Sequence, residues 1–225
     1  GHDEENLVGA AVLLNTSRRY PLSISAEGGF QFVGSAENGD WLEGDYGGDV
    51  FIGDGRRYFS FGKNQVMATR LAIGWGNKNP RPFRLGGHSA NDEDVRSLTS
   101  AAIGKRRFTL RGYRKGLRSL QGRRMAVGSV EWRFPIRRIE RHNMGVWWIL
   151  PPAGIHQTHG VLFADGGDAW NRGPRPIESH QSVGFEFHFN AVLVYSLGYQ
   201  FRLGYAHGLN RGGIDEVYFV TANPF

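Results

Sequence analysis

Several histidine, serine and acidic residues have types and spacings that could carry chemistry. His156 and His159 have the spacing of a metal-ligand pair, but no glutamate or third ligand lies beside them, so a solvated turn is the better interpretation. Ser182 lies near His180 and His188, which would suit a hydrolase nucleophile and base. Same-face neighbours on one strand lie about 6.5–7 Å apart, however, so we interpret these three residues as the lining of a polar sheet face.

Other sources of catalysis or metal binding are poorly represented in the sequence. The acidic run Asp92-Glu93-Asp94 lacks the alternating oxygen ligands and the glycine of a calcium loop. There is no cysteine, which excludes disulfides, thiolate metal sites and cysteine nucleophiles. No G-x-S-x-G elbow, Walker loop or dinucleotide fingerprint occurs. We therefore expect a protein that is not an enzyme and that uses no metal and no cofactor.

The elements that would position these residues are β-strands, and the clearest signal runs from Ser182 to Leu209. Apolar residues, many of them aromatic, alternate there with polar or small ones, so each half of the segment predicts a strand with two unlike faces. A soluble β-sandwich produces the same alternation. A membrane barrel is favoured because one face is aromatic along its length, the other mixes charged residues with glycines, and the segments have about the ten residues that a tilted spanning strand needs.

Weaker alternation elsewhere brings the expected number of strands to about nine, and no stretch approaches the roughly 20 apolar residues of a membrane helix. We predict an all-β fold, an antiparallel up-and-down transmembrane β-barrel with about 8–10 strands in this chain, or the C-terminal part of a larger barrel. Residues 1–225 would form one barrel domain. The further predicted strands are 7–15, 30–36, 44–61, 65–75, 125–134, 160–169 and 216–225.

A long connection, residues 78–122, interrupts these strands. Connections of this length are usually functional or disordered. Motifs inside and after it, taken together and in this order, resemble those of the bacterial surface antigen superfamily, the β-barrels of outer-membrane protein assembly and two-partner secretion. The matching motifs are Phe83-Arg84-Leu85-Gly86-Gly87, Leu110-Arg111-Gly112-Tyr113, Val130-Glu131-Trp132-Arg133-Phe134-Pro135, Phe163-Ala164-Asp165-Gly166-Gly167 and the C-terminal aromatic Phe225.

The resemblance implies a role for each of these motifs. The loop would begin at Gly86 and Gly87 and fold back into the barrel, and Arg111 at its Arg-Gly-Tyr tip (Arg111, Gly112, Tyr113) would pair with Asp165 and Glu131 on the inner wall. Alternation independently places Glu131 on a polar face, and a confined guanidinium needs acidic partners. The alternative is that Arg111 is one solvated charge in a basic loop. Phe225 would be the C-terminal signal that assembly machinery reads.

The function that the resemblance implies is insertion of barrel proteins into the bacterial outer membrane, or translocation of polypeptides across it. The family barrel has sixteen strands and is preceded by periplasmic modules, so this chain corresponds to its last nine or so. It is then either a fragment or a small relative that closes alone or by pairing with another copy. Rival interpretations are a barrel anchor for a missing N-terminal domain, a passive pore and an outer-membrane hydrolase.

The basic character of the chain bears on its partners. The net charge is +6, from 27 Lys and Arg against 21 Asp and Glu, and residues 105–124 are rich in arginine and lysine. Nucleic-acid binding is disfavoured, because only Phe108 and Tyr113 interleave with these charges and no recognition helix is apparent. We expect outer-membrane lipid and the phosphates of lipopolysaccharide as partners, with a polypeptide client, in keeping with the general attraction of basic surfaces for anions.

Overall fold

The computed structural model describes residues 5–18, 25–62, 64–88, 103–138, 153–171, 173, 179–193 and 197–222. In this part of the chain no helix is long and apolar enough to cross a membrane. The predicted C-terminal signal Phe225 and the acidic run 92–94 lie outside the described residues.

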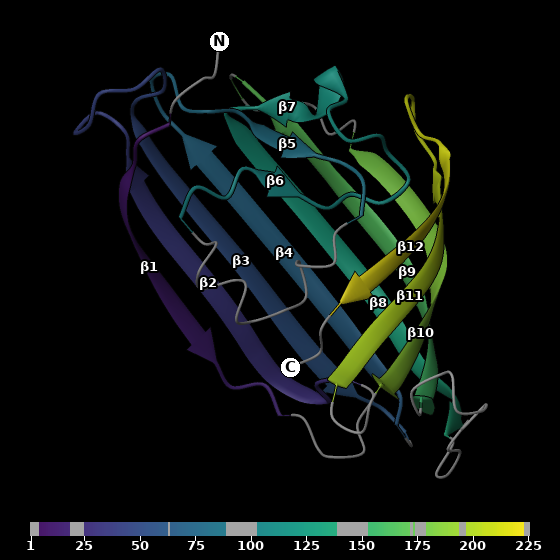
Figure 1. Cartoon of the computed structure of the whole chain (residues 1–225). Coiled ribbons are helices and arrows are strands. Elements are labelled where there is room, and N and C mark those ends of the chain that lie inside the picture. Colours follow the sequence, from purple (N-terminus) through teal and green to yellow (C-terminus); the bar gives the residue numbers. More distant parts are fainter. Residues whose placement is uncertain are drawn as a thin grey trace.

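The prediction of an all-β chain is confirmed by one large antiparallel sheet of nine strands, in which neighbours along the chain are neighbours in space (Figure 1). Each strand corresponds to one of the segments predicted from alternation. The largest difference is at the strand predicted over 160–169, which starts seven residues earlier because it pairs with β8 as far back as Gln157 and with β10 as far back as Ala153. In spatial order the strands are β1 (Val8–Asn15), β2 (Gly28–Asn38), β3 (Asp49–Ser60), β4 (Val66–Gly76), β8 (Arg124–Arg138), β9 (Ala153–Trp170), β10 (His180–Leu193), β11 (Leu197–Gly208) and β12 (Asp215–Ala222).

We predicted either a closed barrel or the C-terminal part of a larger one, and a closed barrel is not found in the described part of the chain. The sheet is curved, and β1 and β12 lie at its two ends with no strand paired to their outer edges (Figure 1). Strand direction explains this physically. Neighbours are antiparallel throughout, so the first and the ninth strand run in the same direction. Closure of this sheet onto itself would require a parallel pair in an otherwise antiparallel sheet.

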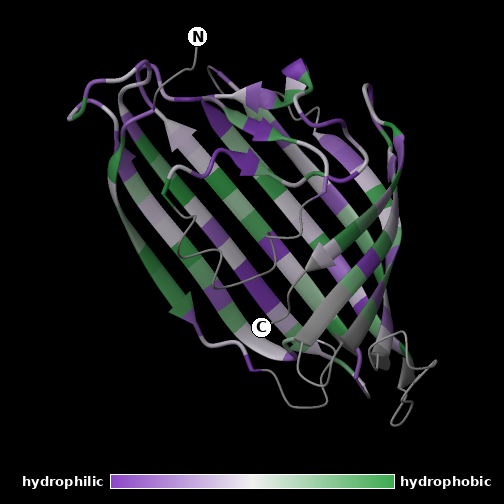
Figure 2. Cartoon of the chain, in the orientation of Figure 1, coloured by the Kyte–Doolittle hydropathy of each residue, from purple (hydrophilic) through white to green (hydrophobic). Residues whose placement is uncertain are grey.

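The two faces of the sheet have opposite character, and Figure 2 shows hydrophobic and hydrophilic bands alternating along the strands. On β10, Val183 and Phe185 are each 42% exposed, whereas Glu186 and His188 are 4% and 1% exposed. We call the buried, more polar side the inner face and the exposed, apolar side the outer face. This polarity is the reverse of what a sheet in water shows, where the apolar face is covered.

Described parts of the long connection, residues 77–88 and 103–123, pack against the inner face (Figure 1). They contain a three-stranded sheet of β5 (Phe83–Leu85), β6 (Arg107–Phe108) and β7 (Gln121–Gly122), and the short 3-10 helix η1 (Arg118–Leu120). We call residues 78–122 the inner loop. Its apolar side chains and those of β3, β4, β8 and β9 form the largest core cluster, made of Val50, Ile52, Ala72, Phe83, Leu85, Phe108, Leu110, Tyr113, Leu120, Met125, Val127 and Ala169.

Candidate functional site

Glycines set the path of the inner loop at the positions that the sequence singled out. Gly86 has a φ of 128° and Gly112 a φ of 77°, a region that other residues rarely adopt. A Cβ atom on Gly86 would lie 2.6 Å from the carbonyl oxygen of Arg114, and one on Gly112 would lie 2.8 Å from the backbone nitrogen of Gly208. Gly87 also has a positive φ, and its N–H donates to the carbonyl of Tyr113 at 2.7 Å. The turn that presents Arg111 therefore requires these glycines.

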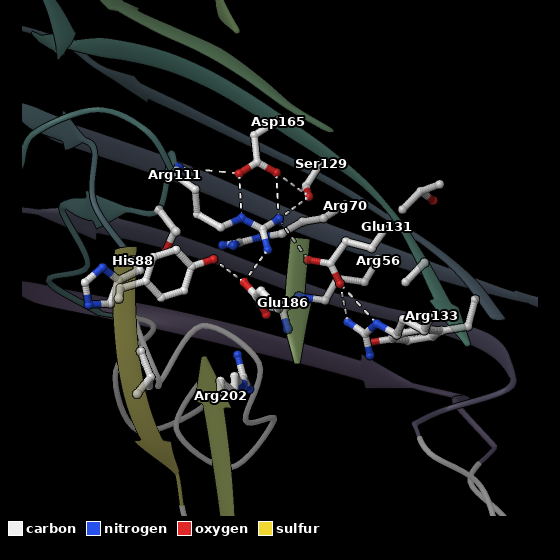
Figure 3. A pocket seen from close by; sticks show the side chains of 16 residues that line it. Arg56, Arg70, His88, Arg111, Ser129, Glu131, Arg133, Asp165, Glu186 and Arg202 are labelled. Atoms are coloured by element: carbon white, nitrogen blue, oxygen red, sulfur yellow. Dashed lines mark hydrogen bonds and ion pairs between the residues drawn. The ribbon is translucent and has the colours of Figure 1, made fainter. Parts of the chain in front are cut away.

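Arg111 points from the tip of the inner loop into a group of acidic side chains on three adjacent strands (Figure 3). Its Nε and Nη2 donate to the two carboxylate oxygens of Asp165 on β9, each at 2.7 Å, in a bidentate pair. Nη2 also donates to Glu131 on β8 at 2.9 Å, and Nη1 donates to Glu186 on β10 at 2.8 Å. Two of these partners, Asp165 and Glu131, are those that the resemblance implied.

A second ring of contacts holds the three acids in place. Ser129 donates to Asp165 at 2.7 Å, Arg133 donates to Glu131 at 2.7 and 3.0 Å, and Tyr218 donates to Glu186. His188 also bonds to Glu186. Glu186 was on the predicted polar face, but no motif singled it out. The signal that could have identified it is its position, since it lies on the strand next to Asp165 and faces the same side.

The site keeps the arginine charged although it removes it from water. Burial lowers the pKa of Arg111, but Asp165 and Glu131 outweigh this and raise its pKa well above the ordinary value. The guanidinium carbon also lies 3.5 Å from the ring centroid of Phe163, a cation–π contact. A buried charge with three carboxylate partners and a ring beneath it is a fixed structural bond and not a solvated loop charge.

Tyr113, the third residue of the Arg-Gly-Tyr tip, fastens the loop to the other side of the site. It is fully buried, and its hydroxyl donates to the carbonyl of Gln181 at 2.7 Å and accepts from the N–H of Asn210 at 3.2 Å. The N–H of Gly112 donates to Glu216 at 3.2 Å. The tip is therefore in contact with β8, β9, β10 and β12 and with the turn that follows β11.

The residues considered for catalysis are not brought together. Ser182 is buried, and its hydroxyl has no hydrogen-bond partner among the described residues. His188 instead bonds to Glu186 and packs on His159, with ring centroids 4.6 Å apart. Within the residues that the structure describes, no group of three or more His, Asp or Glu could hold a metal ion.

We call the ion pairs of Arg111 with Asp165, Glu131 and Glu186 the lock. A small polar cavity of about 80 Å³ adjoins it and is large enough for a few water molecules. Its lining includes Arg56, Arg70, Arg133 and Arg202 beside the acids of the site (Figure 3). The arrangement offers charge and hydrogen bonds, and these hold the inner loop against the sheet.

The fold and this site together define a curved, open antiparallel sheet whose inner face is occupied by a loop that a buried arginine fastens. Compared with models of known protein families and with curated proteins, the chain matches none. The geometry around Arg111 and the motifs that supply it are therefore the grounds for a functional assignment.

Proposed function

We propose that this chain is part of the wall of a bacterial outer-membrane β-barrel of the assembly and secretion superfamily, which inserts or translocates polypeptides without making or breaking bonds. The observation that carries the proposal is Arg111, held by carboxylates of β8, β9 and β10 at the tip of a loop on the inner face. Its partners would be outer-membrane lipid and lipopolysaccharide, with an unfolded polypeptide as client.

The outer face supports a location in a membrane. Large apolar side chains are exposed on the outer face of the strands from β2 to β12, including Phe32, Phe51, Ile73, Leu162 and Phe219. Monomeric proteins in water rarely expose contiguous apolar patches larger than a few hundred Å². Lipid tails would cover this face. A tilted spanning strand needs about 9–11 residues, and the seven strands between the two edge strands have 11 to 18, whereas β1 and β12 each have 8 described residues.

Strand direction favours one way of completing the barrel. The two free edges, β1 and β12, run in the same direction, so a segment that pairs antiparallel with both must contain an odd number of strands. A second copy in the same membrane orientation would present its edges in that same direction and could pair only in parallel. Nine strands plus an odd number give the even total that bacterial barrels have. This supports the C-terminal part of a larger barrel over self-closure or pairing of copies.

The contacts of Arg111 should make the sheet more rigid, because they connect neighbouring strands to one loop. Arg111 joins three neighbouring strands to the loop through one guanidinium group, and the loop core packs on β3, β4, β8 and β9. The inner loop therefore occupies part of the space that the sheet encloses, and any polypeptide path along the inner face must pass beside it.

Membrane placement can be tested by cysteine labelling, because the chain has no cysteine of its own. In membranes containing the complete polypeptide, Leu162→Cys and Val183→Cys on the outer face should react with an apolar maleimide and not with a charged one. Lys115→Cys, at an exposed position of the inner loop, is the matched control and should react with the charged reagent. Reaction of Leu162→Cys with the charged reagent as fast as the control would rule out lipid contact.

Activity can be tested with vesicles that contain the complete polypeptide. A urea-denatured outer-membrane barrel polypeptide is added, and its folding is followed by heat-dependent gel mobility, with vesicles containing an unrelated barrel as control. Faster folding of the client is expected. Steady ion conductance in planar bilayers without any acceleration would instead establish the passive pore, and neither effect would leave the anchor as the function.

A further inference from the structure

A second buried arginine of the inner loop makes an ion pair far along the sheet from Arg111. Nη2 of Arg106 donates to Glu37 on β2 at 2.7 Å and lies 3.1 Å from a carboxylate oxygen of Glu5. The side chains of Arg106 and Glu37 are 4% and 0% exposed. Glu37 also accepts from the backbone N–H of Gly104 at 3.0 Å, so the loop gives this carboxylate a charged donor and a backbone donor.

The surroundings of Arg106 fix its direction. Its carbonyl accepts from the N–H of Arg84 at 2.7 Å next to the β5–β6 pair, and its guanidinium carbon lies 5.7 Å from the ring centroid of Phe83. Phe83 belongs to the core cluster that packs the loop on the sheet. Arg106 is therefore held at its backbone by the small loop sheet and at its side chain by β2.

Glu37 also touches the free edge strand. Gly9 on β1 lies directly opposite Glu37, and a Cβ atom on Gly9 would be 3.0 Å from Cγ of Glu37. The side chain of Glu37 thus lies beside β1 at Gly9. β1 has no other strand on its outer side in the described residues, so few contacts fix its position.

We propose that Arg106 is a second anchor of the inner loop, independent of the Arg-Gly-Tyr motif, and that through Glu37 it positions the β1–β2 edge of the sheet. The loop is then a strap fastened at two places, to β2 by Arg106 and to β8, β9 and β10 by Arg111. Arg106 is a positioning residue, and its role does not depend on whether the sheet belongs to a secretion barrel.

The test compares Arg106→Gln and Glu37→Gln with Arg107→Gln, which changes a neighbouring exposed arginine and serves as the matched control. Two readouts are taken on the complete polypeptide. Spin labels at Ile103→Cys and Ala36→Cys report the distance between the loop and β2, and labels at Lys115→Cys and Gln181→Cys report the lock region. Hydrogen exchange of the backbone amides reports the opening of β1 and β2.

Loss of the second anchor should broaden only the distance between positions 103 and 36, and should speed exchange in β1 and β2 by about tenfold while β9 and β10 are unchanged. The double variant Arg106→Gln and Glu37→Gln should change no more than either single variant, because each single substitution already breaks the same ion pair. Arg106→Lys, which keeps the charge without the planar fork, should give an intermediate result. An unchanged distance in Arg106→Gln, equal effects in Arg107→Gln, or equal broadening of both label pairs would overturn the proposal.

Discussion

Arg106 and Arg111, the two buried arginines in the described part of the inner loop, lie five positions apart and are fastened in different ways. Arg111 reaches the middle of the sheet, where carboxylates from β8, β9 and β10 surround one guanidinium. Arg106 reaches the edge of the sheet, where Glu37 on β2 and Glu5 ahead of β1 share one nitrogen atom. The first therefore joins strands to one another as well as to the loop, whereas the second joins the loop to one edge.

The cost of losing a buried cation therefore depends on which charged groups it leaves behind. Removing one partner of a buried pair leaves an uncompensated charge, which is far more costly than the net contribution of the intact pair. Loss of Arg111 leaves three buried carboxylates with Arg133 as the neighbouring guanidinium that bonds to Glu131. Loss of Arg106 leaves Glu37 with the N–H of Gly104 and the hydroxyl of Ser35 as donors. We therefore expect the loss of Arg111 to lower the free energy of unfolding more than the loss of Arg106.

The largest effect is expected for Arg111→Ala, which should lower the free energy of unfolding by about 3–5 kcal/mol, the range for breaking a buried ion pair. Urea unfolding of the detergent-solubilised protein, followed by tryptophan fluorescence, measures it. Arg111→Lys keeps the charge but cannot make the bidentate pair with Asp165, so it should recover only part of the loss. A fully stable Arg111→Ala variant would show that the loop is not locked.

The next effect concerns the glycine that follows Arg111. Gly112→Ala should cost about 1–3 kcal/mol for its positive φ, with a further loss from the contact with the backbone of Gly208. Gly116→Ala is the matched control, since Gly116 has a φ of 86° but nothing within 4 Å of its added Cβ. The same unfolding experiment separates backbone strain from the clash. Equal losses in the two variants would mean that the tip is not tightly packed on β11.

A smaller effect, about 1–3 kcal/mol, is expected for Arg106→Ala, because only one carboxylate loses its cation and Glu37 keeps the donors of Gly104 and Ser35. The two anchors share no partner, so Arg106→Ala and Arg111→Ala should be additive within about 0.5 kcal/mol. Urea unfolding of the two single variants and the double variant checks this. A coupling well above that limit would mean that the anchors act as one unit, which would remove the distinction between them.

The smallest effect is expected at an exposed pair outside the strands. The hydrogen bond from Lys78 holds the pKa of Asp40 below its ordinary value of 3.8, and both side chains are largely accessible to solvent. Such pairs contribute little, so Asp40→Asn should not change the urea midpoint measurably at pH 7. Because the folded pKa is lowered, any contribution is present above pH 3.8 and is lost as the pH falls through the lowered pKa. A clear loss at pH 7 would contradict this order.

Much of this fold could be predicted because strand alternation is a local signal. Residues such as Phe185 and Glu186 reveal opposite faces through their immediate neighbours, and all nine strands of the sheet were predicted in this way. The meeting of Arg111 with Asp165 and Glu131 followed from motifs of the family that the sequence resembles, together with alternation. Of the two predicted arrangements, a closed barrel and the C-terminal part of a larger one, the closed barrel is not found in the described residues, because nine antiparallel strands leave β1 and β12 running in the same direction.

Other parts of the site depend on contacts that no local pattern carries. The Arg106–Glu37 pair joins residues 69 positions apart, and one arginine among the many in residues 105–124 gives no sign of its partner. The small sheet of the inner loop uses strands of only two or three residues, which are too short for alternation to reveal. Glu186 was visible as a polar-face residue, but its contact with Arg111 depends on how the loop tip is seated.

The most direct test of the lock is the effect of Asp165→Asn measured in two backgrounds, the wild type and Arg111→Ala, by urea unfolding of the complete polypeptide in detergent. In the wild type this substitution removes part of the bidentate pair and should destabilise the protein. In Arg111→Ala it neutralises a carboxylate that has lost its cation, so it should stabilise the protein. We therefore expect the effect of Asp165→Asn to reverse its sign between the two backgrounds, and the same loss in both would show that Arg111 is not bonded to Asp165.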